Sequence, residues 1–411
     1  MAACAVIITF LAPGASTAAP PVERHGLISV EDYFSTGSAA AYDRNILTTR
    51  MRFDLTKINR DNGLSFHFDG RERMSLGPGD YNSNIKSVFI DTFNLQYSGQ
   101  RYYLSAGRLR PKDLPIESVD GVNVLYQTSD LGMGFFTGSR PDPYTGAVNP
   151  DFLTAGAYLS YRKDDIASSV AFVHTAYKGG TDRQYLYGTL SYVPVTKTRF
   201  YGSVMADVDR TAGGLSPTNA IVELTYLPDG RMSLAVGYTQ FRAIRYWRSM
   251  DYDINGTRQD AYYISGNWRL GDRYAVYGRI ERQTRDYQTA AAGGSPALSN
   301  VLNMGLSADN LLDTGMNMNL SASLTDNYSS RNDSYRMELN RLFRDVLQIV
   351  LSGSVMASSY EITGETDNAY SLGAAGYLFI SRNWSASASF DREQASGYST
   401  NRLMTRLSYK F

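Results

Sequence analysis

Histidine, cysteine and nucleophilic residues are the first places to look for chemistry in this chain, and they are few. The 411 residues include three histidines and one cysteine. Asp69 lies two residues after His67, a spacing that suits a hydrogen bond in a wall better than half of a catalytic triad. No Gly-x-Ser-x-Gly segment and no second histidine at metal-ligand spacing accompanies it. The sequence therefore predicts no enzyme activity, no metal site and no cofactor.

Charged residues that alternate with apolar ones form a second group with chemical potential. In an extended strand such charges share one face, so if the apolar face contacts lipid, the charged face lines a lumen. The two signs are interspersed, which predicts weak charge selectivity because a selective pore concentrates one sign in a ring. Alternatively, many of these charges pair across strands and only solvate the wall. The predicted pore-lining residues are Arg50, Arg52, Asp54, Asp69, Arg71, Glu223, Arg279, Glu281, Arg336, Glu338, Asp391, Glu393, Arg402 and Arg406.

The period-two pattern predicts the strands that position these residues. At the C-terminus, Arg402 and Arg406 alternate with Leu403 and Leu407, and the chain ends on Phe411. About 22 such segments of roughly 9 to 13 residues can be counted, as expected for transmembrane strands. We therefore predict an all-β fold: one transmembrane antiparallel up-and-down β-barrel of about 22 strands, within a range of 20 to 24, with no plug domain.

Connection lengths and aromatic residues distinguish this barrel from a soluble β-sandwich, which has the same period. Short links such as 129–130, 228–230 and 271–272 alternate almost without exception with longer ones such as 140–151 and 242–256. This matches tight periplasmic turns and longer outer loops. The strands that return to the periplasm end in a belt of aromatic residues suited to a membrane interface: Tyr97, Tyr126, Tyr161, Tyr192, Tyr226, Trp268, Phe343, Phe379 and Tyr409.

Three connections and two strands depart from the regular pattern. Prolines fix irregular paths in 108–115 and 140–144, which makes these the best candidates for inward loops, although an outer surface position is the favoured interpretation. The loop 241–258 interleaves arginines with aromatic residues, as contact surfaces and loops near lipopolysaccharide phosphates do. The strands 88–97 and 102–108 change phase, which indicates either a bulge or a misplaced strand boundary.

Composition excludes several other classes of protein. The chain has 40 basic and 40 acidic residues, so no overall basic field indicates nucleic-acid binding. No run of 18 or more apolar residues follows the N-terminus, which argues against membrane-spanning helices. Thirty-one tyrosines and 43% hydrophobic residues argue against disorder.

The N-terminus has features of an export signal. An apolar core from Ala5 to Leu11 precedes small residues at 16–19, although no Lys or Arg comes before Arg24. We predict a signal peptide over 1–19, which would carry away Cys4, and a barrel over 20–411. A lipoprotein reading of Cys4 is poor because no apolar core precedes it.

The terminal phenylalanine on an alternating strand resembles the C-terminal signature of bacterial outer-membrane β-barrels. The resemblance implies the outer membrane of a Gram-negative bacterium, with Tyr409 and Phe411 as the assembly signal read by the barrel assembly machinery. Outer-membrane lipid and lipopolysaccharide would be further partners. The leading hypothesis for function is a porin-like channel for passive transport of small solutes.

A second hypothesis is a sheath that encloses a partner. The segments 63–71, 106–108 and 119–122 resemble the porin component of porin–cytochrome conduits in metal-reducing bacteria. That resemblance implies a barrel around a multihaem cytochrome in a trans-outer-membrane electron-transfer complex, with no haem bound covalently by this chain. An outer-membrane enzyme or a substrate-specific receptor is the third and least favoured hypothesis.

Overall fold

The computed structural model describes most of the chain after residue 21. The described ranges are 22–38, 43–58, 63–76, 88–111, 114, 118–142, 146–209, 213–242, 244, 248–249, 258–285, 297–327, 330–360 and 363–411. The predicted signal peptide lies outside them. The structure therefore tests the strands of the predicted barrel and only parts of its longer connections.

The described residues form 22 strands in chain order, each with the alternating pattern predicted from the sequence. Their bounds are β1 (Glu23–Gly37), β2 (Arg44–Thr56), β3 (Leu64–Ser75), β4 (Val88–Ser98), β5 (Tyr102–Leu109), β6 (Val119–Gln127), β7 (Leu131–Ser139), β8 (Phe152–Lys163), β9 (Ile166–Tyr177), β10 (Gly180–Val195), β11 (Thr198–Asp209), β12 (Gly214–Asp229), β13 (Met232–Arg242), β14 (Arg258–Leu270), β15 (Tyr274–Arg285), β16 (Ala297–Leu311), β17 (Met316–Asn327), β18 (Ser330–Phe343), β19 (Leu347–Tyr360), β20 (Thr366–Phe379), β21 (Trp384–Gln394) and β22 (Ser399–Lys410).

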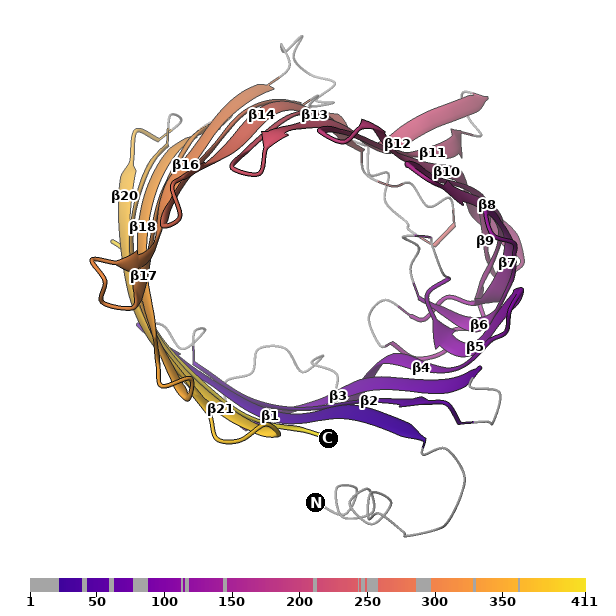
Figure 1. The fold of residues 1–411 in the computed structure, drawn as a ribbon, viewed down its shortest axis with the longest axis horizontal. Coiled ribbons are helices and arrows are strands. Elements are labelled where there is room, and N and C mark those ends of the chain that lie inside the picture. The colour runs from indigo at the N-terminus through magenta and orange to yellow at the C-terminus, as the bar shows by residue number, and fades with distance from the viewer. Residues whose placement is uncertain are drawn as a thin grey trace.

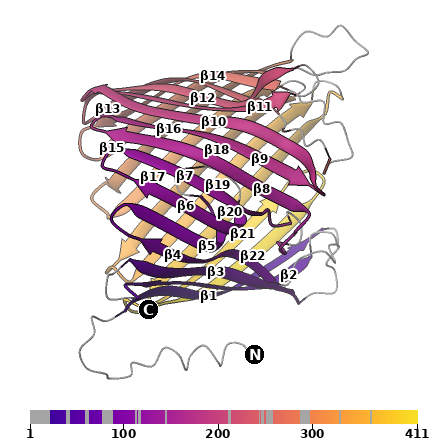
Figure 2. The ribbon, with the colours of Figure 1, turned by 90° about the vertical axis from the view of Figure 1, so that its right-hand side faces the viewer.

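These strands form one closed antiparallel barrel. Each strand pairs with its neighbours in sequence, and β1 pairs with β22 from Leu27 opposite Lys410 to Gly37 opposite Thr400. Figure 1 shows the ring of strands end-on, and Figure 2 shows their tilt across the wall. The described residues include no helix and no plug domain. The predicted fold class and strand number are confirmed.

The two faces of the wall differ as the sequence predicts. Large apolar side chains on the outer face are exposed, for example Leu159, Ile264 and Leu372, at 49%, 61% and 70%. A closed barrel leaves no strand edge unpaired, so such an apolar surface is suited to the hydrocarbon of a membrane. Charged, hydroxyl and amide side chains occupy much of the inner face. The period-two sequence thus sorts its residues between lipid and lumen.

The terminal phenylalanine packs at the seam that closes the barrel. The Phe411 backbone donates a hydrogen bond to the Gly26 carbonyl (3.1 Å) and accepts one from the Gly26 amide (3.0 Å). A Cβ at residue 26 would lie 2.1 Å from the Phe411 ring, so only glycine fits beneath it. Tyr409 lies between Trp384 and Phe411, with ring centroids 4.7 and 6.0 Å away. A role for Tyr409 and Phe411 in assembly stays a prediction.

Connection length distinguishes the two ends of the barrel. At the end where the C-terminus lies, every connection has seven residues or fewer, from 57–63 to 380–383. At the other end, connections run from two residues (178–179 and 328–329) to 15 (243–257). The predicted alternation therefore holds, except that several connections at the second end are also short. Of the predicted belt, Tyr97, Tyr226 and Trp268 are exposed beside the short turns.

The predicted phase change is a bulge between β3 and β4. Their register shifts between Asp69 and Gly70, so that Asp91 has no opposite residue. On β5, Gly107 has a φ of +118°, a conformation that side chains rarely adopt. The predicted irregularity in these two strands is confirmed.

Candidate functional site: the barrel lumen

All fourteen predicted pore-lining residues lie on the inner face. Arg50 and Arg52, for example, alternate with the outward Thr49, Met51 and Phe53 along β2. The remaining twelve residues also alternate with exposed apolar neighbours along their strands. Their contribution to permeation is part of the function proposed below.

Most of these charged residues form ion pairs with each other. The clearest pairs are Arg50 with Asp69 (2.6 Å), Arg279 with Glu281 (2.5 Å), Arg402 with Glu393 (2.8 Å) and Arg336 with Glu338 (3.1 Å). Looser ones join Arg52 to Asp54 (3.7 Å) and Arg71 to Asp91 (3.9 Å). Opposite charges at this distance cancel most of each other's field in water. The described lumen therefore has no ring of a single sign.

The inner wall of β21, β22 and β1–β3 holds the greatest density of these charges, and we call it the charged wall. It contains Arg50, Arg52, Asp54, His67, Asp69, Arg71, Asp391, Glu393, Arg402 and Arg406. Its pairs are partly hydrated, since the side chains of Arg50 and Arg402 are 44% and 46% exposed. Such pairs contribute little to stability and are free to interact with ions.

His67 bonds to a different carboxylate from the one its sequence spacing suggests. Its Nδ1 lies 2.6 Å from Asp54 Oδ1, and its Nε2 lies 3.1 Å from Ser65 Oγ, while Asp69 bonds to Arg50. The order carboxylate, imidazole and hydroxyl is the one used in nucleophilic catalysis. Catalysis also needs donors for an oxyanion, and the backbone amides of β3 lie in a strand paired on both sides. The arrangement is therefore consistent with the predicted wall hydrogen bond.

The inner wall of β5–β11 differs from the charged wall, and we call it the covered wall. Leu125, Phe136 and Val173 point inward and are fully buried, in a cluster that includes Tyr158 and Tyr187. Glycines make room for the rings: a Cβ at Gly134 would lie 2.1 Å from Tyr158, and one at Gly156 would lie 2.5 Å from Phe136. Inward-pointing apolar residues can be buried in a wide barrel only if something lies over them.

Part of the cover comes from connections that fold inward. Leu114, between β5 and β6, is 7% exposed and belongs to the buried cluster. Gly146, between β7 and β8, lies against the ring of Phe89, which Arg71 contacts on the inner face of β4. In Figure 1, coloured pieces of these connections lie within the ring of strands. Leu114 of the inward-loop candidate 108–115 thus lies inward, and the favoured interpretation of this segment as an outer surface loop is wrong. Residues 143 and 144 of the other candidate, 140–144, lie outside the described residues, so its course stays a prediction.

A third connection is attached to the covered wall through one carboxylate. Asp182, in a bulge of β10, is completely buried. It accepts hydrogen bonds from the backbone amides of Arg248 (2.7 Å) and Ser249 (3.0 Å) and from the Ser249 hydroxyl (2.7 Å). The Arg248 guanidinium lies against Gly180. Of the predicted contact loop, the aromatic residues at 246, 247 and 252 lie outside the described residues.

Two buried ion pairs stabilise the strands that carry the covered wall. Arg108 donates to both oxygens of Asp120 (2.6 and 2.7 Å) and to the Ile90 carbonyl (2.7 Å). Arg183 donates twice to Asp207 (3.1 and 2.8 Å) and stacks on Tyr185, 4.1 Å from the ring centre. Their arginine side chains are only 10% and 8% exposed. These pairs are structural, because a buried charge needs its partner.

Between the two walls, β12–β15 carry a polar network. Tyr263 donates a hydrogen bond to Glu223 (2.6 Å), and Arg279 stacks on the Tyr263 ring at 3.7 Å while it binds Glu281. Farther on, β16–β20 present hydroxyl and amide groups, including a Ser354–Ser371 pair at 2.7 Å. These surfaces are hydrophilic but carry few net charges.

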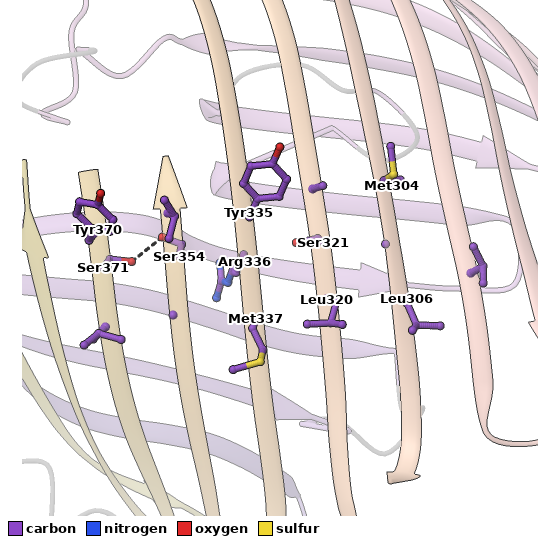
Figure 3. Close-up of a pocket in the computed structure, with 16 residues that line it drawn as sticks. Met304, Leu306, Leu320, Ser321, Tyr335, Arg336, Met337, Ser354, Tyr370 and Ser371 are labelled. Atoms are coloured by element: carbon purple, nitrogen blue, oxygen red, sulfur yellow. Dashed lines mark hydrogen bonds between the residues drawn. The ribbon is translucent and has the colours of Figure 1, made fainter. Parts of the chain in front are cut away.

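A separate hollow of about 750 Å³ lies over β15–β20, on the outer face. Figure 3 shows Met304, Leu306, Leu320, Met337 and Tyr335 around it, with Ser354 and Ser371 behind them in the wall. Since those five side chains have the lipid-facing phase, the hollow is a depression in the membrane surface and no part of the lumen.

The covered wall was not predicted from the sequence, because every inward residue was expected to be polar. One signal was available: Gly132, Gly134 and Gly138 occupy the inward positions of β7 in alternation. Glycine in a strand indicates that another group approaches closely. Among the described residues there is also no cluster of three or more His, Cys, Asp or Glu that could hold a metal.

A closed barrel with an apolar outer face and a polar inner face defines an outer-membrane β-barrel. Its fold is that of known outer-membrane proteins. The ferric enterobactin receptor PfeA, from Pseudomonas aeruginosa, aligns with a TM-score of 0.64 at 10% identity, over 96% of this chain and 82% of that one. The copper transporter OprC aligns with a TM-score of 0.56 at 11% identity, over 95% and 80%. Pseudomonas aeruginosa OpdL aligns at 0.48 and 10%, over 95% and 98%. No protein-family model and no curated protein matches the sequence.

Proposed function

We propose that this protein is an outer-membrane channel through which small hydrophilic solutes diffuse passively, with weak selectivity for charge. The observation that carries the proposal is the pairing of inward charges: Arg50, Arg279, Arg336 and Arg402 each bind a carboxylate on the same inner face. A hydrated wall with balanced charge favours passage of polar solutes and excludes neither ion sign. The inward connections over the covered wall narrow the lumen from one side.

Single-channel recording in planar bilayers tests this function. The purified protein is expected to give stepwise ohmic currents in potassium chloride and similar permeabilities for potassium and chloride. Arg402→Glu is expected to shift the reversal potential toward cation preference. Arg331→Glu is the control, since Arg331 also forms an exposed ion pair with a carboxylate, that of Asp333 (3.3 Å), but on the outer face. A protein that inserts without conducting contradicts the proposal.

The sheath hypothesis is tested by purification in mild detergent. No contact of the described residues favours a cytochrome in the lumen, and the comparisons give this hypothesis no support. A colourless preparation that conducts ions is expected. A red complex that stains for haem would replace the channel by the sheath.

The enzyme hypothesis depends on Ser65 and His67. We expect a fluorophosphonate probe to leave Ser65 unlabelled in the folded barrel, because the backbone amides of β3 are engaged in strand pairing and form no oxyanion hole. Labelling that disappears in Ser65→Ala and in His67→Ala would instead identify a hydrolase.

A further inference from the structure

A polar cavity of about 350 Å³ lies against the inner wall of β6–β11, near the short-turn end of the barrel. The inward side chains that line it include Arg162 and a group of uncharged polar residues: Gln127, Ser160, Ser169, Thr189, Ser191 and Tyr201. It lies next to the apolar cluster of the covered wall, in a part of the lumen that contains none of the predicted pore-lining charges. Its volume is in the range of small-molecule sites.

The strand register groups these hydroxyls. Ser169 lies opposite Ser160 on one side and Thr189 on the other, and Ser191 lies opposite Tyr201. The hydroxyls of Ser169 and Thr189 are 2.7 Å apart. The space beside them exists because the wall residues are small: a Cβ at Gly132 would lie 2.5 Å from the Ser160 hydroxyl. Four adjacent strands thus present hydroxyl groups to one hollow.

The chemistry of the lining selects a class of ligand. Each hydroxyl can donate and accept a hydrogen bond, as the hydroxyls of a sugar can. Tyr201 is 37% exposed and offers an aromatic edge or face for the apolar side of a sugar ring. The charged residues that line the cavity, Arg162 and Asp130, have opposite signs, so the lining carries no net charge. A charged solute gains little from such a site.

We propose that this cavity is a binding site for a neutral polyhydroxylated solute, of the size of a mono- or disaccharide, within the lumen. The proposal rests on the proposed channel function and names the class of solute that the channel retains during passage. Hydrogen bonds to several hydroxyl groups and contact with the Tyr201 ring hold the solute at the wall and slow its passage. No conformational change is needed.

The test is block of the potassium chloride current by sucrose in planar bilayers. Sucrose is expected to reduce the current with a saturable concentration dependence, whereas a polyethylene glycol of similar mass reduces it only in proportion to viscosity. Thr189→Val with Ser191→Ala is expected to weaken the block about tenfold, the size of one or two lost hydrogen bonds. Tyr201→Ala is a second, independent variant expected to weaken it.

Ser321→Ala is the matched control, because Ser321 is an inward hydroxyl of β17 on the opposite wall. It should leave both the current and the block unchanged. A conducting channel on which sucrose acts like polyethylene glycol, or whose block is unchanged in both cavity variants, overturns the binding site and leaves the channel intact. Absence of any conductance refutes the channel itself.

Discussion

The covered wall and the charged wall belong to the same sheet, yet their inward residues are held by different forces. On β5–β11, Leu125, Phe136 and Val173 are fully buried, and connections from one end of the barrel lie over them. On β21, β22 and β1–β3, many inward residues are arginines and carboxylates that remain hydrated. One side of the lumen is a packed core, and the other is a wet surface.

This difference shows how a wide barrel can narrow its lumen without a separate plug. A connection that turns inward must bury apolar surface to offset the entropy of ordering its chain. The glycines and aromatic rings of the covered wall supply that surface, whereas charged and hydroxyl side chains dominate the charged wall. Mutations on the two walls should therefore separate into effects on stability and effects on ion passage.

Phe136→Ala is expected to cause the largest loss of stability on the covered wall. The ring is completely buried between β6, β8 and the cluster, so its removal leaves a cavity that costs about 3–5 kcal/mol of the free energy of unfolding. Urea unfolding of the barrel in lipid vesicles measures the loss. A change below about 1 kcal/mol would mean that the cluster is not a packed core.

Arg108→Ala should have an effect approaching that of Phe136→Ala. It leaves the carboxylate of Asp120 buried without its partner, and breaking a buried pair costs about 3–5 kcal/mol. Vesicle unfolding again provides the measurement, and the double variant Arg108→Ala with Asp120→Ala should recover part of the loss. If the double variant were less stable than the single one, the pair would not be the cause.

Asp182→Ala is expected to have a moderate and more local effect. Three donors lose their acceptor, which costs about 1–3 kcal/mol. Faster hydrogen exchange of the Arg248 and Ser249 amides should accompany the loss, with exchange in the charged wall unchanged. Protection that stays the same in both places would show that Asp182 does not hold this connection.

Arg402→Ala should have the smallest effect on stability. Its pair with Glu393 is half-exposed, and such pairs contribute about 0–1 kcal/mol. Its effect should instead appear in the reversal potential, because Glu393 loses its counter-charge in the lumen. A destabilisation as large as that of Arg108→Ala would remove the distinction between the two walls.

Local patterns of the sequence predicted the wall of this barrel. The alternation of Arg402 and Arg406 with Leu403 and Leu407 assigns each side chain to a face, because neighbouring residues in a strand always point in opposite directions. The same reasoning gave the number of strands, the end with short turns and the bulge near Asp91. These properties depend only on residues close together in the chain.

Partners across strands could not be predicted in the same way. His67 bonds to Asp54 and not to Asp69, because the register of β2 against β3 places Asp54 directly opposite it. A register shifted by one residue would have changed every such partner. The inward position of Leu114 likewise depends on the apolar surface of strands that follow it in the chain.

By itself, the sequence determined that this chain forms a closed membrane barrel with charges inside and ends on a phenylalanine. Only the tertiary structure decided that those charges are paired, that Phe411 covers Gly26 at the seam, and that one side of the lumen is filled. The physical reason is the distance along the chain between the residues that set each property. Strand faces follow from the geometry of single peptides, whereas ion pairs, glycine pockets and buried connections follow from contacts between strands that are distant in the sequence.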